Sequence, residues 1–346
     1  MTPSPLPVDS LDVWGATASL PEQVAEAAEQ AREAVAGMEV GECTDAVVLG
    51  TGTAGLAGDL LAALAAGAAP VPVGVVKGFD LPVHVGPRTL VFAVSASGDD
   101  AETVSSAAAA YDRGARVLTV AGGGELGRLA EARGGWLLHV PPVRPVRAAL
   151  GWLTVPVLVA AGELGLLADV PGHLEDARHQ LRRRRDQLVG DDSPAAASAR
   201  RIGRTMLLVH GAQPVAAVAA RRWKSQVNEN AKAPAFASSQ PELSHDEVSG
   251  WGQFGDVTRQ VFTLVLLRTE DEHPAVARRI TAVAELMDEV VAATIEVRAE
   301  GRGDLARFFD LALVGDFVSL HLAGRDGVDP GPVPSIDDVA RQAASP

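Results

Sequence analysis

Residues 46–55 read AVVLGTGTAG, an apolar run that enters a glycine-rich turn. The run has the length of one strand, and the Ala/Leu-rich residues from about 56 to 67 predict a helix after the turn. The succession continues, with strands expected at 72–76, 89–95, 116–120 and 136–140 and helices at 100–113 and about 125–133. Short all-apolar strands that alternate with helices predict a parallel sheet covered on both faces.

The second half of the chain repeats this opening. Residues 206–211 read MLLVHG, a strand that enters a glycine turn, and a helix is expected from Val215 onward. Further strands fit 260–267 and 293–298, and further helices fit 274–291 and 303–323. The right-handed crossover rule gives each half a flavodoxin-like or Rossmann-like layout. We predict an α/β protein with two such subdomains, residues 1–165 and 204–346, joined by a helical linker region at 166–203.

Two segments near the middle of the chain stand out by their charge. Arg182 to Arg185 form a run of four arginines, which favours a solvated helix face or linker over an anion-binding patch. The longest uncharged run lies between Arg147 and Glu163 and is shorter than the ~20 residues of a membrane span. We interpret it as a buried core helix.

The overall composition excludes several classes of protein. The 346 residues include 30 Lys and Arg against 44 Asp and Glu, and the resulting charge of −14 disfavours binding to nucleic acid or to an anionic membrane. Cys43 is the single cysteine of the sequence, which excludes an intrachain disulfide and a multi-cysteine metal site. The N-terminus has no basic region followed by an apolar stretch, so we expect no secretory signal and a cytoplasmic protein.

The first glycine loop has the sequence pattern of a dinucleotide-binding loop. Gly50, Gly52 and Gly55 have the spacing of a dinucleotide fingerprint, in which a helix N-terminus holds a pyrophosphate. That fingerprint also needs an acidic residue at the end of the second strand, to bind the ribose hydroxyls. The second strand ends in Lys77 instead. This departure argues against NAD(P).

A second loop, Ser95-Ala96-Ser97-Gly98, follows the strand at 89–95. Two hydroxyls and a glycine turn at the start of a helix are able to bind an anion, although a serine N-cap explains the same letters. Both loops are expected at the carboxyl ends of neighbouring parallel strands, which is where open α/β sheets bind ligands.

The most specific stretches of the chain are NENAKAPAF at 228–236 and PELSHDEV at 241–248. With Pro145-x-Arg147, Gly58-Asp59 and Asp329-Pro330, they give a chain that resembles the bifunctional phosphoglucose/phosphomannose isomerases of the sugar isomerase (SIS) superfamily from about residue 45 to 340. The resemblance implies two SIS subdomains and a homodimer with a shared active site. It also implies aldose–ketose isomerisation of glucose 6-phosphate, mannose 6-phosphate and fructose 6-phosphate through a cis-enediol, without metal or other cofactor.

The resemblance assigns catalytic roles to three residues. Glu229 is the base that moves a proton between two carbons, although a Glu between two amides also suits a helix surface. His245 is the residue that opens the sugar ring and is supplied by the partner subunit. A loop histidine satisfied by a neighbouring carboxylate is one alternative. A metal ligand is another, which we discard because no other grouping of His, Asp and Glu has metal-site spacing. Arg147 stabilises the negative charge of the enediolate, and an ion pair at a helix start is its alternative.

The phosphate site departs from the family pattern. The family's Gly-Gly-Ser is Gly52-Thr53-Ala54 here, and its Ser-Gly-Asn-Thr is Ser97-Gly98-Asp99-Asp100. The expected phosphate ligands are therefore Gly52, Thr53, Ser95 and Ser97, with the Asp100 carboxylate facing the pocket in place of a threonine. Ala340 stands where the family has a lysine. These changes leave open a catalytically impaired SIS protein that binds a sugar derivative and has a regulatory role.

Overall fold

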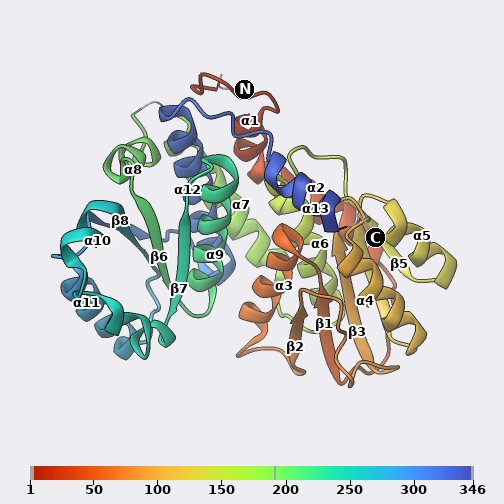
Figure 1. Ribbon diagram of the computed structural model, residues 1–346. Helices are drawn as coiled ribbons and strands as arrows, with labels where there is room; N and C mark the ends of the chain where they lie inside the picture. The colour runs from red at the N-terminus through yellow and green to blue at the C-terminus, as the bar shows by residue number, and fades with distance from the viewer. Residues whose placement is uncertain (1–3, 191, 344–346) are drawn as a thin grey trace.

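The computed structural model describes residues 4–190 and 192–343, and Met1 to Pro3 of the N-terminal stretch discussed above lie outside it. The chain forms two parallel sheets with helices on both faces of the first (Figure 1). The α/β fold class and the two-sheet architecture are confirmed. Within the described residues, no helix is long and apolar enough to cross a membrane.

The first sheet has the strand order β2-β1-β3-β4-β5. Its strands are β1 (Asp45–Leu49), β2 (Val73–Val76), β3 (Thr89–Ser95), β4 (Arg116–Ala121) and β5 (Trp136–His139). They agree with the expected strands to within one residue at each end. Because the order reverses between β1 and β3, the loops after these two strands flank the switch point where such sheets bind ligands.

Both faces of the first sheet are buried, which explains why its strands lack polar alternation. On one face, Phe92 and its neighbours pack in a core that contains α2 (Leu20–Val35), α3 (Gly52–Ala65) and α6 (Leu150–Glu163). On the other face, Val91 packs with residues of α4 (Ala101–Asp112) and α5 (Gly124–Arg133). Residues 150–161 of α6 are all buried, which confirms the core-helix interpretation.

The second sheet has the order β7-β6-β8-β9. Its strands are β6 (Met206–Ala212), β7 (Ala235–Gln240), β8 (Phe262–Arg268) and β9 (Ala293–Arg298), and its helices include α9 (Val215–Asn230), α10 (Gly255–Val261), α11 (Pro274–Met287) and α12 (Gly303–Arg325). The short 3-10 helices η2 (Glu242–Ser244) and η3 (Glu247–Gly250) follow β7. The sequence analysis did not predict β7, because AFASSQ has too few apolar residues to stand out.

Helices from both halves join the two sheets into one core. Residues of α6, α9 and α12 belong to a single apolar cluster that also reaches β3 and β6. Helix α9 packs against α12 so closely that a Cβ on Gly315 would lie 2.4 Å from the Trp223 ring, and the Trp223 indole donates to the Leu311 carbonyl at 2.7 Å. Only glycine fits at position 315. The end of α9, which carries the motif at 228–232, is therefore held rigidly at the junction of the halves.

The arginine run lies on α7 (Val170–Leu188), which precedes α8 (Pro194–Ile202). The expected solvated face is wrong for one of its members. Arg184 is buried and donates to both carboxylate oxygens of Asp310, at 2.7 and 2.8 Å. Arg183, one position before, stays exposed and pairs with Glu300. One arginine of the run is therefore part of the core, and the other three lie at the surface.

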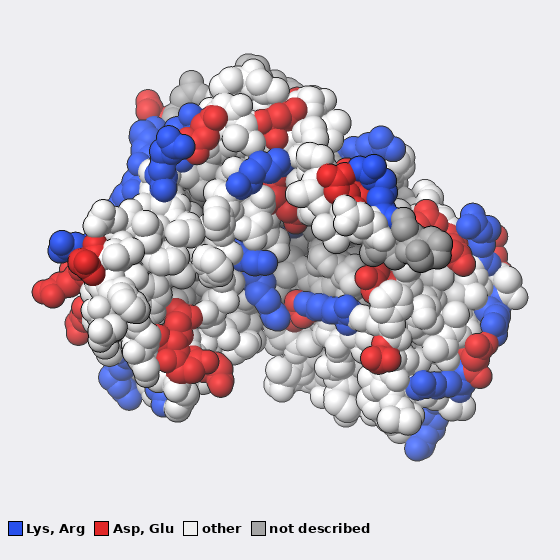
Figure 2. All heavy atoms as spheres, viewed as in Figure 1, with Lys and Arg blue, Asp and Glu red and all other residues white. Residues whose placement is uncertain are grey.

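The N-terminal segment around Ser10 meets the segment after α12 near the junction of the halves. The N-terminal α1 (Val13–Ala18) and the segment after α12 lie together, and α13 (Pro334–Ala343) crosses back over the first half (Figure 1). The space-filling view shows a hollow between the two halves, with basic side chains on both of its walls (Figure 2).

Candidate functional site

Glu229 is the second-last residue of α9, so the motif at 228–232 is the end of a helix. The amide of Asn228 donates to the Ala233 carbonyl at 2.8 Å, and Lys232 adopts the left-handed conformation that stops the helix. Pro234 follows and prevents its continuation. The motif therefore fixes the Glu229 side chain at a sharp and rigid chain reversal.

Arg147 faces Glu229 from the other half of the molecule. It lies in the short helix η1 (Val146–Ala148), and its Nη1 is 3.9 Å from Oε2 of Glu229. The arginine side chain is 5% exposed and the glutamate side chain 26%, so the glutamate is the more accessible partner. Asn230, fully buried, accepts from Arg147 Nε at 2.6 Å and donates to Ser319 Oγ at 2.9 Å. The site thus combines one partly accessible carboxylate with one buried cation.

A buried ion pair supports the backbone of η1. Arg222 donates to the two carboxylate oxygens of Asp316 at 3.0 and 2.7 Å, and its Nη2 also donates to the Arg147 carbonyl at 2.9 Å. The pair joins α9 to α12 and to η1 at once. Arg147 is consequently positioned through its main chain as well as its side chain.

Burial sets the proton affinities at the site. It raises the pKa of Glu229 above the ordinary glutamate value, against the charges of Arg147, Arg222 and Lys232, which favour the carboxylate. Burial and the charge of Arg147 lower the pKa of Lys232 to about 8. A glutamate with a raised pKa is better suited to accept and return a carbon-bound proton near neutral pH.

The first glycine loop leaves its helix N-terminus uncapped. Thr51 is the N-cap of α3 but makes no side-chain cap hydrogen bond, and Gly52 and the half-buried Thr53 form the first turn. A Cβ on Gly55 would lie 2.6 Å from the Gly50 carbonyl, so the glycine spacing reflects close packing of the turn. The free amides of this turn are donors for an anion.

At the position where a dinucleotide site needs an acid, the structure has a cation. Lys77 Nζ lies 2.5 Å from Oδ2 of the buried Asp59, about two turns along α3. Arg221 of α9 approaches the same carboxylate at 3.7 Å. An ion pair in place of a ribose-binding acid agrees with the argument against NAD(P).

The second loop turns a carboxylate inward. Ser95 is buried at the end of β3, and its hydroxyl accepts from the Gly98 amide at 2.8 Å and donates to Oδ2 of Asp100 at 2.5 Å. Asp100 is the N-cap residue of α4 but makes no cap hydrogen bond to it. Asp99 turns away and accepts from the Glu125 amide at 2.9 Å. Asp100 therefore lies inside the expected phosphate loop, while Ser97 is exposed at its rim.

His245 lies apart from this group in the hydrogen-bond pattern. It is exposed at the end of η2, and among the described residues no hydrogen bond or ion pair joins it to Glu229 or Arg147. Its acidic neighbours are engaged elsewhere, because Asp246 accepts from the Glu247 amide and Glu247 bonds His210 at 2.8 Å. The single chain brings Glu229 and Arg147 together but leaves His245 on the surface.

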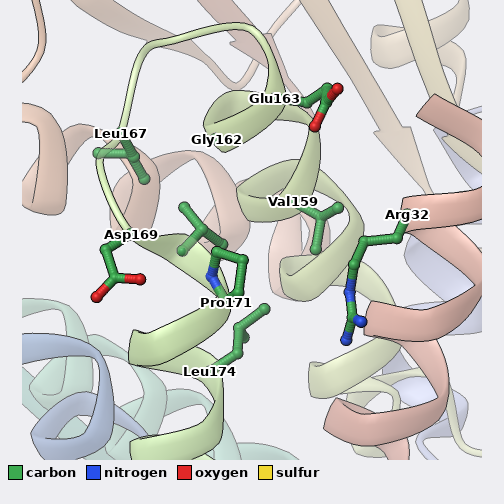
Figure 3. Close-up of a pocket in the computed structure, with 9 residues that line it drawn as sticks. Arg32, Val159, Gly162, Glu163, Leu167, Asp169, Pro171 and Leu174 are labelled. Atoms are coloured by element: carbon green, nitrogen blue, oxygen red, sulfur yellow. The ribbon is translucent and has the colours of Figure 1, made fainter. Parts of the chain in front are cut away.

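The sequence reasoning missed several residues that build the site. Asn230 is part of the motif at 228–232, but its hydrogen bond with Arg147 is known only from the structure. The carbonyls of Pro330 and Gly331, which also bind Arg147, leave no signal in side-chain letters. A separate pocket of about 160 Å³ lies between α2, α6 and α7 (Figure 3). Its walls carry none of the motif residues, and its Asp169 caps α7, so we do not assign the site there.

The fold and the site together define an α/β protein with two parallel sheets and a carboxylate–arginine pair where the halves meet. The model for the bacterial phospho-glucose isomerase C-terminal SIS domain matches residues 191–342. A putative phosphosugar isomerase from Clostridium difficile 630 shares the fold, with a TM-score of 0.72 at 14% identity over 92% of this chain and 95% of that one.

Two sequence relatives identify the family. The bifunctional phosphoglucose/phosphomannose isomerase of Caldicellulosiruptor bescii is 30% identical over 94% of this chain and 97% of its own length. The protein of the same name from Aquifex aeolicus is 32% identical over 78% of this chain and 81% of its own. The chain belongs to the bifunctional phosphoglucose/phosphomannose isomerase family.

Proposed function

We propose that the protein is an aldose–ketose isomerase that interconverts glucose 6-phosphate or mannose 6-phosphate with fructose 6-phosphate. The observation that carries the proposal is the pairing of a partly exposed carboxylate, Glu229, with a buried guanidinium, Arg147, at 3.9 Å. The names of the relatives support the substrate class. The described residues contain no cluster of three or more His, Cys, Asp or Glu that is placed to hold a metal ion.

The geometry suits proton transfer through a cis-enediol. Glu229 removes the C2 proton of the open-chain aldose, and the electron pair moves to the C1 carbonyl oxygen as an enediolate. Nη1 of Arg147 stabilises that developing charge from a site that water reaches poorly. After a proton moves from the C2 oxygen to the C1 oxygen, Glu229 returns its proton to C1 and the ketose forms. One carboxylate serves both carbons.

The phosphate is proposed to bind between the two loops at the switch point. Gly52 and Thr53 offer the uncapped amides of α3, and Ser95 and Ser97 offer hydroxyls at the end of the neighbouring strand β3. Asp100 occupies part of this space through its bond to Ser95. The phosphate therefore has to displace or reorient a carboxylate, which makes this cradle weaker than one lined by threonine.

His245 is proposed to act in the active site of a partner subunit, where it opens the sugar ring. Its exposure supports this role, as do the exposed apolar side chains around its segment: Phe236 on the edge strand β7, and Phe254 and Val257 near α10. Exposed apolar side chains grouped beside a functional residue are typical of a subunit interface. We propose a homodimer with two shared sites.

Subunit complementation tests the shared site. Glu229→Gln and His245→Ala each inactivate a homodimer. In a mixed dimer, one site receives both substitutions and the other receives neither. Random mixing of the two inactive proteins should therefore restore about a quarter of the wild-type activity. No recovery in dimers that have exchanged subunits would show that each chain supplies its own histidine.

We further propose a cytoplasmic enzyme with subdomains at residues 1–165 and 204–346 and a helical connection at 166–203. The charge of −14 and the metabolic relatives support the location, and the position of α7 between the sheets supports the division. The impaired, regulatory alternative is less well supported, because Glu229 and Arg147 are both in place.

The assay couples isomerisation of each hexose phosphate to a dehydrogenase. We expect turnover with all three, and a loss of about 10²- to 10⁴-fold in Glu229→Gln, the range for removal of a general base. Glu285→Gln, on the exposed face of α11, is the matched control and should keep full activity. Wild-type protein that turns over none of them, yet melts at higher temperature with a sugar ligand, would support the regulatory alternative instead.

A further inference from the structure

The three nitrogens of the Arg147 guanidinium have different partners. Nε donates to the side chain of Asn230 at 2.6 Å. Nη2 donates to two main-chain carbonyls, those of Pro330 and of Gly331, the latter at 3.0 Å. Nη1 faces the Glu229 carboxylate at 3.9 Å. Two nitrogens are thus held by neutral oxygens, and the third faces the base.

Other buried arginines of this chain are held by carboxylates. Arg222 makes a two-pronged pair with Asp316, and Arg184 makes one with Asp310, with all four contacts between 2.7 and 3.0 Å. A carboxylate in such contact cancels most of the field of the guanidinium, whereas a carbonyl satisfies its N–H groups without cancelling the charge. Arg147 therefore keeps a positive field for an anion that forms beside Glu229.

The carbonyls that bind Arg147 are held in place by contacts between residues 10–11 and 329–331. Asp329 accepts from the Gly331 amide at 2.9 Å and from the Ser10 amide at 3.3 Å. Gly331 fits tightly, because a Cβ there would lie 2.9 Å from Leu11 and 3.1 Å from Ser10 Oγ. Residues 10–11 and 329–331 thus pack into one unit. Lys232, next to the catalytic helix end, also donates to the Pro330 carbonyl at 3.2 Å.

We propose that residues 329–331 are a positioning clamp for Arg147, in which Asp329 and Gly331 orient two carbonyls so that the guanidinium presents Nη1 to the substrate beside Glu229, with no carboxylate in direct hydrogen-bond contact. Asp329 and Gly331 are positioning residues that act through Arg147. The inference rests on the proposed isomerase function for its kinetic test. Its structural test, the mobility of the arginine, stands apart from that function.

The kinetic test compares Asp329→Ala, Asp329→Asn and Gly331→Ala. A displaced guanidinium weakens charge stabilisation at the enediolate, so Asp329→Ala and Gly331→Ala should lower kcat by ~10- to 100-fold with KM within about twofold. A five-carbon hydroxamate phosphate, which mimics the planar enediolate, should bind more weakly by the same factor as kcat falls. Asp329→Asn keeps an oxygen that accepts from Gly331 and should restore most of kcat.

Asp326→Ala is the matched control, since Asp326 is an exposed acid of the same terminal segment that pairs with Arg325. It should leave kcat unchanged. Equal losses in Asp329→Asn and Asp329→Ala would overturn the clamp, because the charge of Asp329 and not its acceptor oxygen would then matter. A kcat within twofold of wild type in both Asp329→Ala and Gly331→Ala would overturn it as well.

The second readout is the exchange of the Arg147 Nε proton, followed by nitrogen-15 NMR and assigned with Arg147→Lys. We expect slow exchange in the wild type and in Asp326→Ala, and at least tenfold faster exchange in Asp329→Ala and Gly331→Ala. Unchanged exchange would refute the clamp even if the protein isomerises sugars. Faster exchange in a protein without isomerase activity would support the clamp and refute the proposed function.

Discussion

Replacement of Asp100 by threonine tests the phosphate site most sharply. The Asp100 carboxylate lies 2.5 Å from the Ser95 hydroxyl, at the position where a phosphate is proposed to bind. Two unit charges ~4 Å apart repel by about 4 kcal/mol at an effective dielectric of 20. Because Asp100 is half-exposed, we take about a third of that figure, roughly 1.4 kcal/mol, which corresponds to a tenfold change in affinity.

Asp100→Thr should therefore raise affinity for hexose 6-phosphates by tenfold or more, and Ala54→Ser in addition should raise it further. The dissociation constant is best measured by calorimetry in a Glu229→Gln background, in which substrate is not consumed. Asp112→Asn, at the exposed end of the same helix, is the control and should have no effect. A change of less than twofold in Asp100→Thr would refute the argument for an occupied phosphate cradle.

Three further predictions concern the base and the core. Since burial raises the pKa of Glu229 and only its carboxylate accepts a proton, the acid limb of kcat/KM should lie above the ordinary glutamate pKa. Lys232→Met removes a positive charge that favours the Glu229 carboxylate, so it should move the acid limb of kcat/KM to higher pH. Arg279→Met, at an exposed position of α11, is the control and should not move it. A shift of the limb to lower pH would contradict the reasoning. Gly315→Ala should lower the free energy of unfolding by roughly 1–3 kcal/mol, because the added Cβ collides with Trp223. Gly67→Ala is the control and should not lower it, because a Cβ there has no atom within 4 Å. Equal melting temperatures of the two variants would argue against the tight packing at Gly315. Arg184→Ala leaves the buried Asp310 without its cationic partner and should lower the free energy of unfolding by about 3–5 kcal/mol, measured by denaturant unfolding. Arg183→Ala, at an exposed ion pair, should lower it by less than ~1 kcal/mol. Similar losses in the two variants would refute the core role of Arg184.

The sequence was sufficient for the features that depend on local pattern. The apolar run that enters Gly50 predicts β1 and α3, and the contiguous motif around Glu229 is enough to select it as the proposed base. Burial of residues 150–161 followed from the absence of charge alone. Where the local sequence determines a strand or a helix, the sequence pattern and the structure agree.

Features that depend on distant partners were not predictable in the same way. Half of the residues of β7 are polar, and the strand forms because it pairs with β6 at the edge of the sheet. Arg184 is buried only because Asp310 arrives from α12. The partners of Arg147 include main-chain carbonyls near the end of the chain, and carbonyls are the same at every residue. Long-range contacts of this kind become visible only when the tertiary structure is known.

The central claim, that Glu229 moves a proton between C1 and C2, is tested most directly by isomerisation of fructose 6-phosphate in D₂O. A carboxylate that carries the proton exchanges it with solvent during part of the turnovers, so the aldose product should contain deuterium at C2, and Glu229→Gln should abolish both turnover and incorporation. Turnover by the wild-type protein with no solvent deuterium at C2, together with undiminished activity in Glu229→Gln, would contradict the account.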